Sequence, residues 1–317
     1  AKELNINPFE LSKKMTEEFF KDMKALNILS VNLYAKASEH IPEIIQQISI
    51  LIDKGYAYKV NGDIYFDISK FPEYGKLSHQ KPEELIMHRI EPDPRKRNPG
   101  DFALWKSKKP GEPFWESPWS EGRPGWHIED TAITYTYFGS QYDIHGGAIE
   151  LVFPHHEAEI AQGESLSGVK PMVNFWVHTG VLTIKGQKMS KSLKNYITIR
   201  DALKNYSVNA LRIFFASSHY RSPIDFNEEK LKQAEVIAEN LYRIYKKTLN
   251  LLEKTVKIEG DSEITREVEA AKKSFYEAME DDFNTPQALA VLINFSKKID
   301  SYISEKTGKK DLEDIIN

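Results

Sequence analysis

The feature that most constrains the fold of this 317-residue chain is a change of pattern near Glu228. From Leu151 onward, short apolar runs alternate with helical stretches, which is typical of an α/β sheet. Beyond Glu228, apolar residues keep helical spacing almost throughout, over Leu231–Leu252, Ile264–Met279 and Pro286–Glu305. The sequence therefore predicts an α/β region that is followed by an all-α region.

Two helices and a hairpin are predicted near the start of the chain. Apolar residues have helical spacing over Pro8–Leu26 and Ile41–Ile52, and Gly55 is a typical helix-ending residue. Between residues 56 and 68, two strand-like runs flank Asn61-Gly62. That pair suits a type I′ turn, so we expect a β-hairpin there.

Residues Phe71–Pro118 show little periodicity and are rich in proline, glycine and aromatic residues. We therefore expect a small irregular insertion. Its three tryptophans are expected to be packing residues: Trp105, Trp115 and Trp119. Trp126 and His127 follow in a segment bracketed by glycine and proline, and such a pair belongs either to a core or to a binding pocket.

Composition excludes several classes of protein. The net charge of −4 means that any contact with nucleic acid must depend on local basic patches. The chain has no cysteine, so it forms neither disulfides nor an all-thiolate zinc site. No apolar run approaches the roughly 18 residues of a membrane span, and the first residues lack a signal-peptide pattern. We expect a soluble, cytoplasmic protein.

A polar segment, Gly186–Ser192, carries two lysines and two serines after an apolar run. The ammonium groups of Lys188 and Lys191 can offset negative charge on a triphosphate, while Ser190 and Ser192 donate further hydrogen bonds. The alternative is an ordinary solvated turn, because lysine-rich turns are common on protein surfaces.

The segment His145-Gly146-Gly147 follows a short strand-like run over Tyr142–Ile144. Paired glycines allow the backbone to approach a flat or charged ligand closely, and free amides there can bind a nucleotide. The same pair is also common in simple turns, so both interpretations stay open.

The densest group of titratable side chains lies just after Pro154. On a helix that starts there, His155 and Glu159 are one turn apart and share a face, whereas His156 and Glu157 diverge from it. An imidazole and a carboxylate so placed either bind a metal ion together or form an ordinary surface pair.

The segment Gly186–Ser192 contains Lys-Met-Ser-Lys-Ser, which resembles the ATP-closing loop of class I aminoacyl-tRNA synthetases. Four further segments narrow the resemblance: Gly122–Glu129, Asp143–Leu151, Phe153–Gln162 and Asp281–Pro286. In this order and at this spacing, the five segments resemble the cysteinyl-tRNA synthetases over nearly the whole chain.

The resemblance implies a domain order. It implies a partial α/β Rossmann-like catalytic domain at residues 1–55 and 120–185, interrupted by a small α+β connective insertion at residues 56–119. A linker region with the signature loop follows at residues 186–228. The last part, residues 229–317, is then a truncated all-α bundle that binds tRNA.

The resemblance also implies an activity: ATP-dependent ligation of cysteine to its tRNA through a cysteinyl-adenylate. ATP is expected with Mg²⁺, and the partners are tRNA, cysteine and ATP; we expect a monomer. Lys188 and Lys191 then stabilise the leaving pyrophosphate, with Ser190 and Ser192 ordering the loop. The remaining implied contacts are adenosine at His145, Gly146 and Gly147, ribose at Glu150, and the amino acid at Trp126 and His127.

One departure from the family concerns zinc. The family holds zinc with residues at the positions of His155 and Glu159 and with two cysteines, and that zinc binds the thiol of the substrate. Asp130 stands where one of these cysteines is expected. Either His155, Glu159 and Asp130 hold zinc, or the pocket works without metal. A carboxylate is less thiophilic than a thiolate, which favours weak or absent zinc.

A second departure is the missing first motif of class I synthetases, His-Ile-Gly-His, which does not occur in this sequence. We therefore expect an internal fragment of a larger cysteine–tRNA ligase, inactive as an isolated chain. Two alternatives remain. One is a non-catalytic fragment or paralogue that binds tRNA or nucleotide, and the other is a related cysteine ligase acting on an amino sugar.

Overall fold

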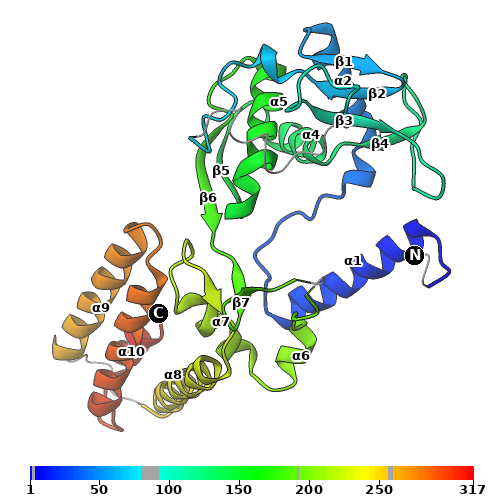
Figure 1. Ribbon diagram of the computed structural model, residues 1–317. Coiled ribbons are helices and arrows are strands. Elements are labelled where there is room, and N and C mark those ends of the chain that lie inside the picture. The colour runs from blue at the N-terminus through cyan, green and yellow to red at the C-terminus, as the bar shows by residue number, and fades with distance from the viewer. Residues whose placement is uncertain (2–3, 80–92, 191–192, 256–259, 261) are drawn as a thin grey trace. The chain divides into compact units, whose positions relative to one another are not determined.

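The structure is a computed structural model that describes residues 1, 4–79, 93–190, 193–255, 260 and 262–317 (Figure 1). The chain divides into two units. Unit 1 comprises residues 1–20 and 29–178, and unit 2 comprises residues 21–28 and 179–317. Helix α1 (Pro8–Ala25) contributes residues to both units. The predicted helix over Pro8–Leu26 is thus confirmed.

Unit 1 contains an antiparallel sheet with the strand order β1-β2-β3-β4. The strands are β1 (Ala57–Val60), β2 (Asp63–Phe66), β3 (Phe102–Ser107) and β4 (Gly122–Pro124). Strands β1 and β2 form the predicted hairpin. Asn61 and Gly62 both have a positive φ, at 50° and 89°, as a type I′ turn requires.

The expectation that Phe71–Pro118 is irregular is wrong for β3, which pairs with both β2 and β4. Its register shifts at Ile64/Tyr65, because Ile64 pairs with Trp105 while Tyr65 pairs with Ala103. At such an irregularity, buried and exposed residues no longer alternate strictly along the strand. The sequence of β3 therefore lacks the alternation of apolar and polar residues that predicts a strand. As predicted, Trp105 is a packing residue: it is fully buried.

A second sheet in unit 1 joins β5 (Tyr142–Ala148) to β6 (Val173–Thr179). The amide of Tyr142 donates to the carbonyl of Met172 over 3.0 Å, and Gly146 lies near the carbonyl of Val177. Residue numbers rise together along the two strands, from Tyr142 beside Met172 to Gly146 beside Val177. The strands therefore run in the same direction, with helix α5 (Glu157–Ser167) as the crossover. The glycine pair, expected in a turn or loop after a strand, lies within β5 instead.

Three helices of unit 1 pack together beside the antiparallel sheet (Figure 1). They are α2 (Ile41–Asp53), α4 (Trp126–Phe138) and α5. The core between them contains Ile44, Ile48 and Ile128, all fully buried. The short helical turns of this unit are η1 (Ala37–Glu39), η2 (Ile68–Lys70), η3 (Ile149–Leu151) and η4 (Val152–His156), the last with π-helical hydrogen bonding.

A row of hydrogen-bonded polar side chains (the polar chain), buried in the core, crosses the interface between these helices. The side-chain amide of Gln47 donates to the hydroxyl of Thr131 over 3.0 Å, and that hydroxyl donates to the side-chain oxygen of Gln162 over 2.9 Å. Gln47, Thr131 and Gln162 are at most 4% exposed. Because α2, α4 and α5 each contribute one member, the chain fixes their mutual register.

Unit 2 begins with a small sheet, in which β7 (Leu182–Ile184) lies between β8 (Gln187–Lys188) and β9 (Ile224–Asp225). Helices follow: α6 (Ile199–Leu203), α7 (Val208–Ala216), α8 (Glu228–Lys254), α9 (Ser262–Glu280), α10 (Thr285–Tyr302) and α11 (Lys309–Ile316). The three helices predicted beyond Glu228 are thus confirmed, apart from small differences at their ends.

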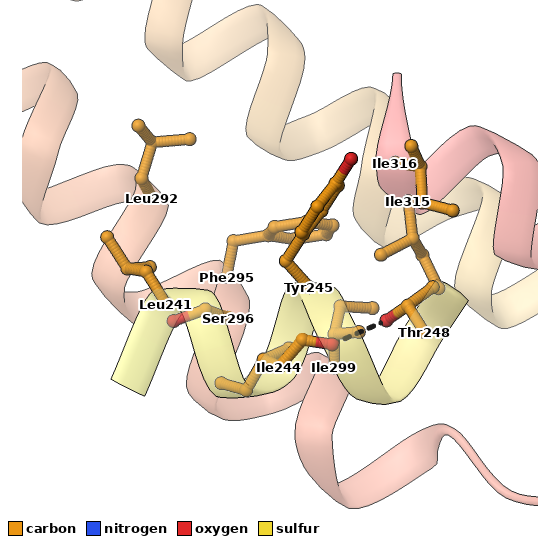
Figure 2. A pocket seen from close by; sticks show the side chains of 10 residues that line it. All are labelled: Leu241, Ile244, Tyr245, Thr248, Leu292, Phe295, Ser296, Ile299, Ile315 and Ile316. Carbon is orange, nitrogen blue, oxygen red and sulfur yellow. Dashed lines mark hydrogen bonds between the residues drawn. The ribbon is translucent and has the colours of Figure 1, made fainter. Parts of the chain in front are cut away.

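An apolar pocket of about 160 Å³ lies between α8, α10 and α11 (Figure 2). The hydroxyl of Thr248 donates to the carbonyl of Ile244 over 2.9 Å, which satisfies its donor within α8. Among the described residues, none of the helices combines the length and apolar character that crossing a membrane requires.

The polar chain predicts the effect of Thr131→Val. The substitution leaves the Gln47 amide and the Gln162 oxygen without partners in the core, so the free energy of unfolding should fall by about 2 kcal/mol. Urea unfolding followed by tryptophan fluorescence measures it, because all five tryptophans lie in unit 1. The matched control is Thr136→Val, on the exposed side of α4, with a change below about 0.5 kcal/mol. Equal midpoints for the two variants would contradict the structural role.

Candidate functional site

The candidate site lies in unit 1, where the first turn of α4 faces η4 and the start of α5. Its centre is His155, whose Nε2 lies 2.8 Å from Asp130 Oδ2 and 2.8 Å from Glu159 Oε1. The prediction that His155 and Glu159 share a helix face is confirmed. Both side chains are buried, whereas that of Asp130 is 44% exposed, so the group opens to solvent on the α4 side.

The local sequence explains how this group is held. Phe153 precedes a proline, which disfavours helical backbone, and its φ and ψ of −133° and 135° break the helix there. Glu157 is fully buried and accepts hydrogen bonds from the amides of Gly75, Leu77 and Ser78 at 3.0, 2.8 and 2.6 Å. The Glu157 carboxylate thereby anchors the junction between η4, which carries His155, and α5, which carries Glu159.

The charges within the group are coupled. Burial raises the pKa of Glu159 to about 7. Burial alone would lower the pKa of His155, but the hydrogen bond to Asp130 and the nearby carboxylate of Glu159 raise it to about 9. Without a metal ion, therefore, His155 is an imidazolium at neutral pH. It can donate from Nε2 to Asp130 and from Nδ1 to His127, whose Nδ1 lies 2.7 Å away.

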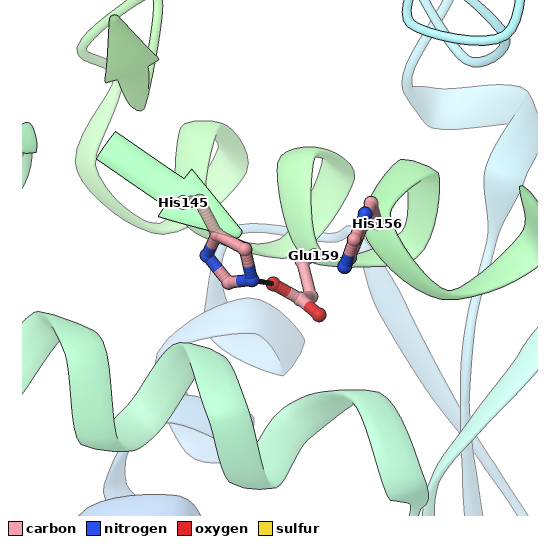
Figure 3. Close-up of side chains that lie close together, drawn as sticks. All are labelled: His145, His156 and Glu159. Atoms are coloured by element: carbon pink, nitrogen blue, oxygen red, sulfur yellow. Dashed lines mark ion pairs between the residues drawn. The ribbon is translucent and has the colours of Figure 1, made fainter. Parts of the chain in front are cut away.

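A second pair of histidines lies on the other side of Glu159. Figure 3 shows His145 and His156 flanking this carboxylate, with His145 Nε2 at 3.4 Å from Glu159 Oε2. The Nδ1 of His145 is hydrogen-bonded to the hydroxyl of Tyr142 at 2.6 Å, and the Nδ1 of His156 to Nε2 of His178 at 2.9 Å. Burial lowers the pKa of His145 to about 4 and that of His156 to about 3, so both rings are neutral.

The donor atoms suit a divalent metal ion. Asp130, His155 and Glu159 each offer one ligand atom, and these atoms lie within 4.8 Å of one another. Glu159 Oε1 is buried and has no hydrogen bond of acceptable geometry, although it is only 2.8 Å from His155 Nε2. An unsatisfied carboxylate oxygen that faces an imidazole and a second carboxylate is chemically a metal-binding arrangement.

Trp126 and His127 open helix α4 and line the same site. The Trp126 ring centroid lies 4.3 Å from that of His155, yet the side chain is 60% exposed, which excludes the core interpretation of this tryptophan. His127 is more enclosed: burial, together with the charge of His155, lowers its pKa to about 3. A neutral imidazole and an open indole face therefore border the Asp130–His155–Glu159 group.

The residues predicted to bind the nucleotide, Gly146, Gly147 and Glu150, differ from one another in their surroundings. A Cβ atom on Gly147 would lie 2.6 Å from Cε1 of His156, so packing against that ring already requires glycine there. Gly146 is exposed, and the nearest atom to an added Cβ would be the carbonyl oxygen of Val177 at 3.8 Å. Glu150 is exposed on η3. A role for these three residues in binding ATP stays a prediction.

The lysine segment belongs to unit 2. Lys185 and Gly186, both with positive φ, form the turn between β7 and β8, and Lys188 ends β8. The side chain of Asn195 accepts from the amide of Ser190 at 2.9 Å and donates to the carbonyl of Lys188 at 3.0 Å. Lys191 and Ser192 lie outside the described residues, so their roles stay predictions.

The sequence did not lead us to expect several side chains that lie at the site. Trp176 and His178 project from the same side of β6 with parallel rings 6.1 Å apart, and both contact His156. The alternation of Trp176 and His178 was the available signal, because residues two apart share a face of a strand. Glu129 was also missed; burial and the charge of Asp130 raise its pKa to about 7.

Residues 1–236 match the family model for the tRNA synthetases class I (C) catalytic domain, and residues 274–316 match the DALR domain. The cysteine–tRNA ligase of Thermodesulfovibrio yellowstonii is 47% identical over 95% of this chain, and that of Thermoplasma acidophilum is 44% identical over 99%. The chain spans 63% and 69% of those two proteins.

Solved structures show the same fold at low sequence identity. Methionyl-tRNA synthetase from Mycobacterium tuberculosis matches the whole chain and 77% of its own length, with a TM-score of 0.68 at 14% identity. A putative arginyl-tRNA synthetase from Campylobacter jejuni matches 96% of the chain and 64% of its own length, with a TM-score of 0.58 at 14% identity. Given the match of the catalytic-domain model to more than half of its residues, the chain belongs to the cysteinyl-tRNA synthetase family.

Proposed function

We propose that the protein to which this chain belongs joins cysteine to its tRNA in two steps. The carboxylate of cysteine attacks the α-phosphorus of ATP, forming cysteinyl-adenylate and releasing pyrophosphate; the terminal ribose of the tRNA then accepts the cysteinyl group and AMP leaves. The observation that carries the proposal is the convergence of Asp130, His155 and Glu159 in a chain of this family.

The residues of unit 1 provide positioning rather than strong base catalysis. Cysteine's carboxylate is already ionised, so the first step needs alignment and charge stabilisation more than proton removal. In this proposal, the open indole of Trp126 and the neutral ring of His127 border the cysteine side chain. The partial Rossmann-like region presents His145, Gly146 and Gly147 to adenosine and Glu150 to ribose. Mg²⁺ accompanies ATP.

Selection of cysteine over serine is the hardest task for such a site. The side chains differ by one atom, and packing alone typically gives only ~10- to 200-fold discrimination for differences of this size. A zinc ion held by Asp130, His155 and Glu159 would supply a direct bond to the substrate thiol. The buried, unsatisfied Oε1 of Glu159 supports this assignment, while the carboxylate of Asp130 makes the set harder than one with a thiolate.

The lysine segment is assigned to the leaving pyrophosphate. Lys188 and Lys191 act on charge that develops as the bond between the α- and β-phosphates breaks, and Asn195 holds the backbone at Lys188 and Ser190. Asp225 Oδ1 accepts from the Thr183 hydroxyl at 2.7 Å and from the amide of Gly186 at 2.8 Å, which fixes the turn before β8.

Lys191→Ala in the full-length protein should lower cysteine-dependent pyrophosphate exchange by about 100-fold or more. The KM for cysteine should change little, because Lys191 acts on transition-state charge rather than on binding of the amino acid. Lys194→Ala is the matched control, a lysine three residues further along the chain, and it should retain exchange within about twofold. Equal exchange rates for the two variants would show that the assignment is wrong.

The metal assignment predicts a difference between Asp130→Cys and the unsubstituted chain. Metal analysis after dialysis against a mild chelator should find zinc largely lost from the unsubstituted chain and retained by Asp130→Cys, because a thiolate binds zinc more strongly than a carboxylate. Cobalt substitution should give a thiolate-to-metal charge-transfer band in Asp130→Cys only. Glu159→Gln in the Asp130→Cys background should release the metal again. Tightly held, stoichiometric zinc in the unsubstituted chain would contradict the prediction.

A further inference from the structure

Glu159 has a second set of neighbours that the Asp130–His155–Glu159 group does not use. His145 on β5 and His156 at the end of η4 flank its carboxylate (Figure 3). One ligand atom from each of His145, His156 and Glu159 lies within 4.8 Å of the others. The three side chains are enclosed: His156 and Glu159 are 1% exposed, and the side chain of His145 is 15% exposed. Two imidazoles and one carboxylate are the protein ligands of several catalytic zinc sites.

The distance between His145 and Glu159 suits a shared metal ion better than a direct hydrogen bond. Nε2 of His145 lies 3.4 Å from Oε2 of Glu159, whereas N–H···O hydrogen bonds span about 2.7–3.2 Å. Around a tetrahedral zinc ion with bonds of about 2.0–2.1 Å, neighbouring ligand atoms are ~3.3 Å apart. Nε2 of His155 is closer to its neighbours, at 2.8 Å from both Asp130 and Glu159. The His145 side of Glu159 therefore already has the spacing of metal ligands.

The second nitrogen of each imidazole has a partner of its own. Nδ1 of His145 lies 2.6 Å from the hydroxyl of Tyr142, and Nδ1 of His156 lies 2.9 Å from Nε2 of His178. Histidines that bind a metal ion usually donate their other N–H to such a partner, which fixes the tautomer and the orientation of the ring. When Nδ1 donates, Nε2 of the neutral ring carries the lone pair that binds the metal ion.

Trp176 and Gly147 shape the surroundings of these two rings. The ring centroid of Trp176 lies 4.7 Å from that of His145 and 4.9 Å from that of His156. The indole therefore packs on both imidazoles, and a hydrophobic shell of this kind limits the access of water to a bound ion. A Cβ atom on Gly147 would lie 2.8 Å from Nε2 of His156, so any side chain there would cover the ligand nitrogen.

We propose that His145, His156 and Glu159 form a second site for a divalent ion such as zinc, distinct from the Asp130–His155–Glu159 group. Nε2 of each histidine and Oε2 of Glu159 bind this ion, and its fourth position is open to water or to an oxygen of a ligand. Because Oε1 of Glu159 faces His155 while Oε2 faces His145, the carboxylate can bridge two ions. Two-metal sites hold their ions about 3.5–4 Å apart.

The second site goes beyond the proposed reaction and does not depend on it. It uses only the imidazole of His145, so the backbone at residues 145–147 stays available to adenosine. Glu159 is its single anionic ligand and is shared, so we expect an ion that exchanges readily and is lost to a chelator. Imidazole ligands favour zinc and cobalt over magnesium, which prefers oxygen. The Mg²⁺ that accompanies ATP therefore does not compete for this site.

The test is titration of Co²⁺ into the chelator-treated 317-residue chain, followed by visible absorption and proton NMR. The unsubstituted chain should bind two ions, and Asp130→Ala should bind one. The ion in Asp130→Ala should shift two solvent-exchangeable signals, from the Nδ1–H groups of His145 and His156. Adding His145→Ala should weaken binding by about 100-fold or more, because a ligand is lost. Zn²⁺ should displace the Co²⁺, whereas millimolar Mg²⁺ should not.

Two more variants separate metal binding from structural roles. Tyr142→Phe in the Asp130→Ala background should weaken Co²⁺ binding ~10- to 100-fold, because the partner that orients His145 is lost. His219→Ala is the matched control, because it removes an imidazole of unit 2 and should leave Co²⁺ binding unchanged.

The proposal is overturned if Asp130→Ala binds no Co²⁺, or if His145→Ala leaves its binding unchanged. Should a variant fail to fold, the unsubstituted chain still decides the matter. Shifted N–H signals from His145, His156 and His155 support two sites, whereas a signal from His155 alone contradicts the second. Pyrophosphate exchange by the full-length protein tests the proposed function separately, so the two failures are distinguishable.

Discussion

The organisation of unit 1 depends on one buried carboxylate, that of Glu159. It belongs to two groups of possible metal ligands, one with His155 and Asp130 and the other with His145 and His156. A buried charge must be matched by nearby donors or by a metal ion, because transfer from water is costly. Helix α4, strand β5 and helix α5 therefore have to meet at this point, and the hydrophobic core between the helices forms around a polar centre.

Several residues around this polar centre make contacts that depend on their particular residue type. Gly147 has no room for a side chain because the His156 ring occupies that space. Glu157 uses its carboxylate to hold three backbone amides at residues 75–78, and the polar chain through Thr131 sets the register of α4. Each contact fixes the direction of an element that carries a site residue. The proposed reaction needs no strong base, and positioning of this kind is what it would require.

Periodicity predicted the long helices and the hairpin at Asn61-Gly62 correctly, because apolar spacing and turn chemistry act locally. It missed β3, where a register shift at Ile64/Tyr65 disturbs the alternation, and α4, whose many β-branched and aromatic residues are weak helix formers. The helical spacing of His155 and Glu159 predicted their shared face. No rule of sequence spacing predicts the contact between Asp130 and His155, because that contact arises from the packing of α4 against the segment that carries His155. The alternation of Trp176 and His178 marked a shared strand face, but only the packing of β6 shows that this face lies against His156.

The strand–helix–strand unit β5-α5-β6 has a further consequence for how the site forms. It carries His145, His156, Glu159, Trp176 and His178 within 34 residues, so their contacts close only short loops. Loop-closure entropy is small for such contacts, and local contacts form early in folding. We expect the histidine layer to be established before the antiparallel sheet docks, which pulsed hydrogen exchange during refolding would reveal as early protection of α5. Assembly of the Asp130–His155–Glu159 group would then wait for a single late event, the arrival of α4 with Asp130.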